Sequence, residues 1–514
     1  MNASLPRRRF LQSLAGTGAL IGSSGLPFAG RLPLVSAEEV KVNPATVRFS
    51  AEIEPLVRLL EETPRDRLLE EMGSRIQKGI TPYRDVLTAL MLGGVRNIQP
   101  RPVGFKFHAV LVIHSAHLAS LNSPDSDRWL PLFWAMDQFK SSQARDISEG
   151  DWTMSAVDEK AVPDAAKARQ AFTEAMDQWD APRVDVAVTG LARAAGAQEV
   201  FDWFCRYGAR DFRDIGHKAI YVANSWRALQ TIGWQHAEPV LRSLGYALLE
   251  HEQGNPAQRD AEQDRPGRRN EPLTDKIRPN WTTGLINPDA RAEMLSVLRS
   301  GNWEQAADKV VELLNRGTHP QSLWDAFFQS ASEMLMRKAG ILSLHAGTTT
   351  NALHYAWENC QNDRTRRFLM LQNASFLTMF RDIADTKEGV KVDEFEPAPL
   401  STPAPSSSPE AAAASLDAIF AEVSGDRMKA AQQTLSWLKN GGDVKSFIAA
   451  AQRLIYLKGT DSHDYKFSSA VFEDYHHLSP DLRDRFLASS VFWLKGSGEK
   501  ENPLVTRTRE ALRA

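Results

Sequence analysis

Histidines recur along this sequence with neighbours that could bind a metal ion or transfer a proton. Four of them each open a helical segment, and they follow one another at intervals of 109, 128 and 118 residues. Neutral imidazole is a common ligand of transition metals, and histidine exchanges protons near neutral pH. A lysine lies close to two of these histidines, so we predict a catalytic set of His108, His217, Lys218, His345, His463 and Lys466.

Two of these segments agree beyond their first histidine. His108 is followed by His114 and His117, and His345 is followed at the same spacings by Asn351 and His354. Residues three apart share one face of a helix, whereas residues nine apart lie on opposite sides of a straight one. We therefore expect His108 and His345 at the start of a helix or before a kink. The predicted cofactor-binding residues are His114, His117, His236, Asn351 and His354.

A bound metal ion is one cofactor that these residues could hold. Glu473 and His476 form one Glu-x-x-His pattern, whereas carboxylate-bridged di-iron bundles use two such patterns and two further glutamates. The identity of the metal therefore stays open. Its candidate ligands are His114, His117, His354, Glu473 and His476. Alternatively, the same histidines are structural and bond to carbonyl groups of neighbouring helices.

Several familiar chemistries lack their motifs. Cys205 and Cys360 are the two cysteines of the chain and form no Cys-x-x-Cys-His, which excludes c-type haem and a thiolate zinc site. Whether they pair with each other stays open. The glycines Gly16, Gly18 and Gly22 follow no strand, so we predict no dinucleotide-binding motif. Patterns typical of phosphate-binding loops and of serine or zinc hydrolases are also absent from the chain after residue 37.

The elements that must position these residues are helices. Helix-forming residues with a period near 3.6 dominate, and strand-like runs are scarce, which predicts an all-α fold. A small-residue helix, an amphipathic helix, a histidine-led helix and an aromatic-rich helix follow one another about four times, so we predict pseudo-repeated helical units curled around a common core. The small-residue helices are expected at 85–93, 185–196, 307–317 and 431–441.

Composition divides the chain after residue 37 into three parts. Residues 38–396 are predicted to form a helical domain of three copies, with a polar insertion at 252–282. Residues 397–415 are rich in Pro, Ser and Ala and predict a linker. Residues 416–514 are expected to form the fourth copy, docked on the main domain.

The first 37 residues resemble a twin-arginine signal peptide. Arg7 and Arg8 precede Phe10 and Leu11, a short glycine-rich stretch follows, and Ala37 ends a small-residue cleavage pattern. We therefore expect recognition by the twin-arginine export machinery and a location in the periplasm or at the cell envelope exterior.

Charge and hydropathy narrow the classes of partner. Removing residues 1–37 takes away four arginines and no acid, so the net charge goes from −3 to −7. An acidic surface argues against a nucleic-acid partner, because binding DNA or RNA needs concentrated Lys and Arg. No apolar run in the mature chain approaches the ~20 residues that cross a bilayer, so we expect no membrane span there.

Three short stretches resemble the questin-oxidase-like family of helical proteins with recurring histidine-rich helices. They are 234–248, the His-Ala and threonine run from His345, and 461–466, within a loose likeness over residues 100–495. The resemblance implies an oxygenase-type reaction on an aromatic or quinone-like molecule, with histidines and Lys218 or Lys466 lining the pocket. Such fungal enzymes use NADPH inside the cell, so an exported relative would need another redox partner, such as a quinone or a metal.

Two functions therefore stay open from the sequence. The first is an exported oxidoreductase-like enzyme that binds a small-molecule substrate or ligand in a histidine-lined pocket. The second is a non-catalytic helical scaffold or binding protein of the cell envelope, with structural histidines.

The export prediction can be tested by replacing Arg7 and Arg8 together with Lys. The double variant should stay in the cytoplasm, because the export receptor reads the arginine pair. Cell fractionation and N-terminal sequencing of the exported wild type measure this. Export of the variant, or a mature N-terminus far from Glu38, would contradict the assignment.

Overall fold

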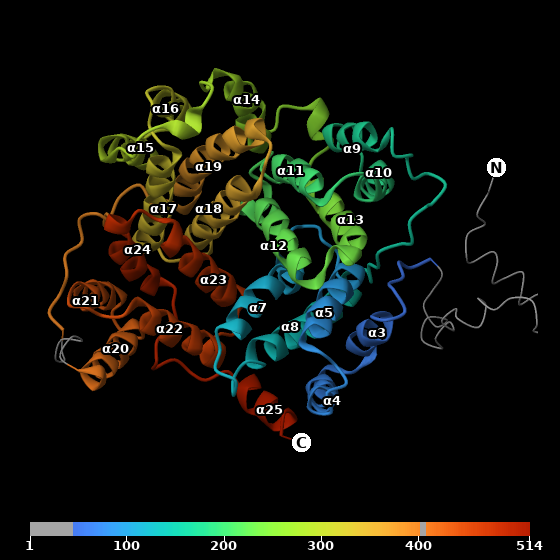
Figure 1. Cartoon of the computed structure of the whole chain (residues 1–514), viewed down its shortest axis with the longest axis horizontal. Coiled ribbons are helices and arrows are strands. Elements are labelled where there is room, and N and C mark those ends of the chain that lie inside the picture. Colours follow the sequence, from blue (N-terminus) through green and yellow to red (C-terminus); the bar gives the residue numbers. More distant parts are fainter. Residues whose placement is uncertain (1–44, 401–407, 514) are drawn as a thin grey trace, which may run out of the picture. The chain divides into compact units, whose positions relative to one another are not determined.

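Helices make up the regular structure of the chain. The structure, a computed structural model, describes residues 45–400 and 408–513. These residues form 23 α-helices, α3 to α25, with short 3-10 turns and no β-strand (Figure 1). The predicted all-α class is confirmed. The predicted signal peptide, residues 1–37, lies outside the described residues.

The first half of the chain forms eleven of these helices. The helices before residue 150 are α3 (Glu54–Glu62), α4 (Arg65–Gln77), α5 (Tyr83–Asn97), α6 (His108–Leu111), α7 (Ile113–Leu121) and α8 (Leu130–Glu149). The next are α9 (Ala168–Asp177), α10 (Ala181–Ala194), α11 (Ala197–Gly208), α12 (His217–Ile232) and α13 (Ala237–Leu248). The small-residue helices expected at 85–93 and 185–196 fall within or largely within α5 and α10.

The second half forms the remaining helices. They begin with α14 (Arg265–Leu273), α15 (Pro288–Ser300), α16 (Trp303–Asn315), α17 (Pro320–Arg337), α18 (Ile341–Asn359) and α19 (Asp363–Ala384). They end with α20 (Pro409–Val423), α21 (Arg427–Lys439), α22 (Val444–Lys458), α23 (Ser462–His477), α24 (Arg483–Ser489) and α25 (Leu504–Ala511). The other two expected small-residue helices correspond to α16 and α21.

Four helical segments pack around one another in a cycle, and we call them the inner helices. They are α6 with α7, α12, α18 and α23. Helix α12 packs against α18, α18 against α23, α23 against α7, and α7 against α12. Figure 1 shows them around the middle of the described part. Each predicted copy therefore contributes one inner helix, while the relation of the copies as repeats stays a prediction.

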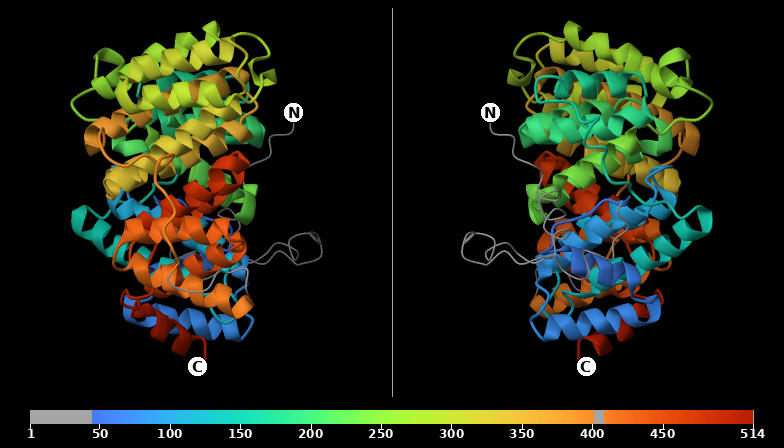
Figure 2. Two further views of the ribbon diagram at one scale, coloured as in Figure 1. Left: turned by 90° about the vertical axis from the view of Figure 1, so that its left-hand side faces the viewer. Right: turned by 90° about the vertical axis from the view of Figure 1, so that its right-hand side faces the viewer.

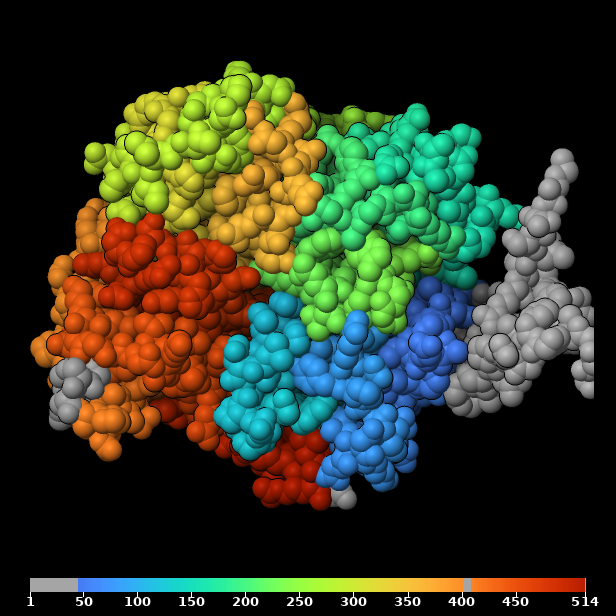
Figure 3. All heavy atoms as spheres, viewed as in Figure 1, coloured from blue at the N-terminus to red at the C-terminus, as the bar shows by residue number. Residues whose placement is uncertain are grey.

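One hydrophobic core connects the helices from all parts of residues 43–514, which form one compact unit. Its largest buried side chains include Trp281, Trp324 and Trp437. In the space-filling view, the cyan, green, gold and red segments meet over the middle of the face shown (Figure 3). The predicted fourth copy is therefore packed against the others.

The two ends of this unit also meet. Helices α4 and α25 lie side by side in both views of Figure 2. A Cβ atom on Gly73 of α4 would lie 2.3 Å from the Ala511 carbonyl oxygen, closer than any real contact. Glycine is therefore needed at this helix crossing, where the backbones approach each other directly.

The polar insertion predicted at 252–282 is more ordered than its composition suggests. Its residues form helix α14, which packs on α19 and α16. Asn270 of α14 is fully buried and donates hydrogen bonds to the side chains of Gln372 and Ser375, 2.8 and 3.0 Å away. Buried polar partners therefore hold a segment that has few apolar residues of its own.

The predicted linker, 397–415, is shorter than expected. Helix α20 begins at Pro409, so residues 409–415 are helical. The Ser408 hydroxyl accepts a hydrogen bond from the Ala411 N–H, and a proline at the first helical position suits helix initiation. The alanine run that follows has the highest helix propensity of any residue type. Residues 401–407 of the linker lie outside the described residues.

The packing of α14 predicts a cost for a single methyl group. A Cβ on Gly267 would lie 2.1 Å from the backbone oxygen of Arg210, which cannot move aside easily. Gly267→Ala should lower the free energy of unfolding by about 1–3 kcal/mol through overpacking, despite the better helix propensity of alanine. Urea unfolding measures this difference.

Gly425→Ala is the matched control, because the nearest atom to its Cβ would be 3.6 Å away. This variant should unfold like the wild type. Equal stability of both variants would show that α14 does not pack against Arg210.

A candidate metal centre of four histidines

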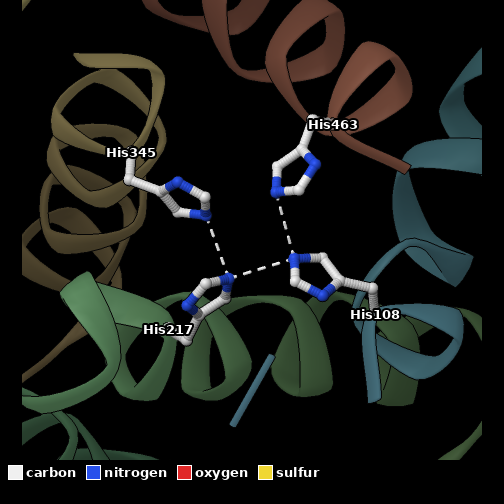
Figure 4. A group of neighbouring side chains, drawn as sticks. All are labelled: His108, His217, His345 and His463. Atoms are coloured by element: carbon white, nitrogen blue, oxygen red, sulfur yellow. Dashed lines mark hydrogen bonds between the residues drawn. The ribbon is translucent and has the colours of Figure 1, made fainter. Parts of the chain in front are cut away.

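Four histidines from the four inner helices meet at one point (Figure 4). The Nε2 atom of His108 lies 3.1 Å from that of His463 and 3.1 Å from that of His217. The Nε2 atom of His217 lies 2.9 Å from that of His345. One nitrogen from each of the four rings lies within 4.8 Å of the other three. We call this group the four-histidine centre.

Each histidine stands at or near the start of its helix. His108 and His217 are the first residues of α6 and α12, and His463 is the second residue of α23. His345 lies in the first turns of α18, which begins at Ile341. The starts of the four inner helices therefore converge.

Two glycines allow the rings to approach this closely. Gly104, with φ +145°, lies against the rings of His108 and His217, where a Cβ would be 3.4–3.5 Å from their atoms. Gly216, with φ +81°, precedes His217, and a Cβ there would lie 2.0 Å from Thr349 Oγ1. Both backbone conformations favour glycine, so these positions shape the centre without contributing a side chain.

The other nitrogen of each ring has a hydrogen-bond partner that can only accept. Nδ1 of His108, His217 and His345 lies 2.9, 2.6 and 2.7 Å from the backbone oxygens of Phe105, Asp214 and Ile341. Nδ1 of His463 lies 2.5 Å from the carboxylate of Asp461. A proton therefore lies on each Nδ1, and a ring that is neutral keeps its lone pair on Nε2.

Burial favours the neutral form of three of these rings. The pKa values of His108, His217 and His345 lie well below the ordinary value of histidine, mainly because burial disfavours the charged ring. The charge of Lys466 lowers all three pKa values further, as do neighbouring histidines. The hydrogen bond from His463 is the largest cause that lowers the pKa of Asp461 to about 2, so this carboxylate is ionised.

Four lone pairs within about 3 Å of their neighbours repel one another unless a cation lies between them. Two ligands at right angles and about 2.1 Å from a metal ion lie about 3.0 Å apart, which matches the observed separations. Backbone oxygens and a carboxylate on the far nitrogens are the usual supports of metal-binding histidines. The residues therefore fit a transition metal bound through four Nε2 atoms.

Lys466 lies beside the four-histidine centre. It follows His463 by three residues on α23, so the two side chains share one face of the helix. Its side chain is buried, and Nζ has no hydrogen-bond partner within the described part of the chain. Burial lowers its pKa to about 7. A neutral amine is therefore accessible near physiological pH, beside the neutral rings of His108, His217 and His345.

Lys218, also predicted to be catalytic, does not join the centre. Its Nζ lies 3.0 Å from both carboxylate oxygens of Asp211 and donates to the Glu250 carbonyl, 2.8 Å away. It follows His217 directly, and successive helical residues point about 100° apart, so its side chain leaves the centre. This lysine forms a buried ion pair instead, and its catalytic role stays a prediction.

His114 and His117 also lie apart from the centre. The helix is interrupted at Val112, between α6 and α7. The rings of His114 and His117 lie beside each other farther along α7, with centroids 6.1 Å apart. Nδ1 of His117 lies 2.9 Å from the Tyr83 hydroxyl. The structure therefore pairs these two rings, as expected, but not with His108.

The remaining predicted ligands are not brought together as one site. Asn351 donates to Glu473 and to Asp474, both 2.7 Å away, and Glu473 also pairs with Arg227. His476 is exposed, so the Glu-x-x-His pattern does not converge on a metal. His236 is half-buried in the 3-10 turn before α13, and His354 lies on the opposite side of α18 from His345.

An apolar cavity lies between α17, α18, α23 and α24. Its volume is about 20 Å³, room for about one water molecule, and its lining includes Phe328, Gly347, Phe467 and the buried carboxyl group of Asp474. Burial raises the pKa of Asp474 well above its ordinary value, while the hydrogen bond from Asn351 acts to lower it. None of the four histidines lines this cavity, unlike the shared pocket that the sequence predicted.

No family model, curated protein or solved structure matches the chain. The resemblance to the questin-oxidase-like family therefore stays a prediction. Among the described residues, no helix combines the length and the hydropathy needed to span a bilayer.

Replacing each of the two buried lysines with methionine should affect the free energy of unfolding differently. In metal-free protein, Lys218→Met should lower the free energy of unfolding by about 3 kcal/mol, because it leaves the buried Asp211 carboxylate short of a partner. Lys466→Met should leave it unchanged or raise it, because Nζ loses no hydrogen bond. Urea unfolding compares both with the wild type. A large loss in Lys466→Met would reveal a structural role for that amine.

Proposed function

We propose that the four-histidine centre binds a transition metal and that the protein is a metal-dependent oxidoreductase. One observation carries the proposal: the four Nε2 atoms converge, with three of their pairs 2.9–3.1 Å apart, while every Nδ1 is held by an acceptor. A scaffold does not need this arrangement, because structural histidines are stable when each ring pairs a donor with an acceptor.

Chemistry narrows the metal. Imidazole nitrogens suit copper, iron, nickel and zinc, and near-right-angle ligand pairs favour tetragonal or octahedral coordination over a closed tetrahedral zinc site. Such coordination leaves positions that a substrate or oxygen can occupy. Since the proposal is a redox reaction, iron or copper is the expected ion, and it would supply the electron transfer.

The surrounding residues support the centre in three ways. The acceptors on Nδ1 fix the ring orientation and raise the basicity of Nε2. Burial of His217 and His345, which are 5% and 0% exposed, excludes bulk water. Lys466 provides a neutral amine that can accept a proton beside the metal without adding positive charge.

The substrate proposal rests on the resemblance to the questin-oxidase-like family, which implies an aromatic or quinone-like molecule. The apolar cavity beside α23 holds only about 20 Å³, so such a molecule would need the surrounding helices to move apart. We further propose that the protein acts after export, where a quinone would replace NADPH as redox partner.

The proposal is tested by the metal content of the purified chain. The wild type should hold about one iron or copper ion per chain, and His217→Gln and His345→Gln should each lose it. Mass spectrometry of the metals and electron paramagnetic resonance measure the loss. His236→Gln is the control, because its half-buried ring lies outside the centre, and it should keep the ion.

Circular dichroism separates loss of metal from loss of fold. Folded variants without the ion, beside a loaded wild type, support the metal centre. If the wild type binds neither iron nor copper when offered each under reducing conditions, the metal centre is contradicted and the non-catalytic scaffold remains. A loaded protein that consumes no oxygen or quinone with any of a panel of aromatic substrates would contradict the oxidoreductase.

A further inference from the structure

A second group of possible metal ligands lies at the other end of two inner helices. His354 and Glu358 stand one turn apart near the end of α18, and His477 is the last residue of α23. One ligand atom from each lies within 4.8 Å of the other two. Glu358 lies 3.2 Å from Nδ1 of His477 and 3.8 Å from Nδ1 of His354, through different carboxylate oxygens.

The His354 ring is buried among aromatic side chains. It is 3% exposed, and its Nδ1 atom faces the Glu358 carboxylate at 3.8 Å. Trp324, Phe328 and Trp357 pack around it, with ring centroids 4.7, 5.2 and 5.7 Å away. Burial lowers its pKa to about 3, so the ring is neutral and keeps a free lone pair. Buried imidazoles normally have a partner, and this one faces a carboxylate instead of a donor.

We propose that His354, Glu358 and His477 form a second metal site, for a divalent ion of the zinc type. Ligands about 2.1 Å from a tetrahedral metal lie about 3.4 Å apart, and the separations of 3.2 and 3.8 Å fall on either side of that value. Two histidines and one carboxylate are a frequent ligand set for zinc, iron and related ions.

The charges and the exposure suit such an ion. Glu358 is ionised: burial acts to raise its pKa, but the hydrogen bond from His477 and the nearby positive charges lower it overall. Arg227 is the nearest competing cation, and it already pairs with Glu473. The side chains of Glu358 and His477 are 35% and 31% exposed, so an ion can reach the site from solvent.

This site is distinct from the four-histidine centre. His354 lies nine residues beyond His345 on α18, about 14 Å along the helix, and His477 lies fourteen residues beyond His463 on α23, about 21 Å. A metal here would join the far ends of two helices whose near ends meet at the first centre. It would therefore act as a structural clamp between α18 and α23.

Cobalt(II) titration of the full-length, chelator-stripped protein tests the proposal. Two equivalents should bind to the wild type, one to His477→Gln and two to His476→Gln, whose exposed ring is the matched control. His217→Gln should also bind one equivalent, with the absorption spectrum of the second site. The cobalt bound at the second site should raise the melting temperature of the wild type but not of His477→Gln.

The outcomes separate the two sites. One equivalent, lost in His217→Gln but kept in His477→Gln, would overturn this inference and leave the first centre intact. One equivalent that is lost in His477→Gln but kept in His217→Gln would support the second site and contradict the first. If His477→Gln fails to fold, Glu358→Gln removes a ligand while keeping the shape of the side chain. Two equivalents in that variant would mean that the group is only an ion pair.

Discussion

Mutual repulsion of four imidazole lone pairs is the constraint on which the middle of this protein depends. A neutral ring whose proton lies on Nδ1 cannot donate a hydrogen bond through Nε2, yet three pairs of Nε2 atoms lie 2.9–3.1 Å apart. The packing of the inner helices must hold them there or a cation must balance them. Side-chain packing supplies rigidity but no charge, so the arrangement is most stable when a metal ion is bound.

The position of the centre follows from how the helices begin. Each histidine comes within the first turns of its helix, where local oxygens (Phe105 and Asp214 among them) can hold Nδ1 without help from a distant segment. Only the convergence of four helix starts is a tertiary feature. The core that fixes those starts involves residues from every part of the described chain, so metal binding and global folding are expected to be coupled.

Local patterns predicted the helices and the four histidines but not which neighbours join them. Periodicity and order of elements are readable in one dimension, and they identified His108, His217, His345 and His463. Lys218 lies apart from the centre, because neighbours in sequence point in different directions on a helix. His354 lies close to Glu358, one turn away, and to His477, 123 residues away, a neighbour that no spacing rule reveals. Helix α14 was not predicted from the sequence, because polar contacts and not an apolar periodicity stabilise its position.

The state of Lys466 follows from the charge of the centre it accompanies. Even without an ion, burial lowers its pKa to about 7. A cation held by His463, on the same face of α23, would repel an ammonium group and lower that pKa further. The lysine beside a loaded centre is then a neutral amine at physiological pH. Beside a bound metal ion, Lys466 could therefore act only as a base. Its buried amine has no hydrogen-bond partner among the described residues, so it could take a proton from a bound molecule.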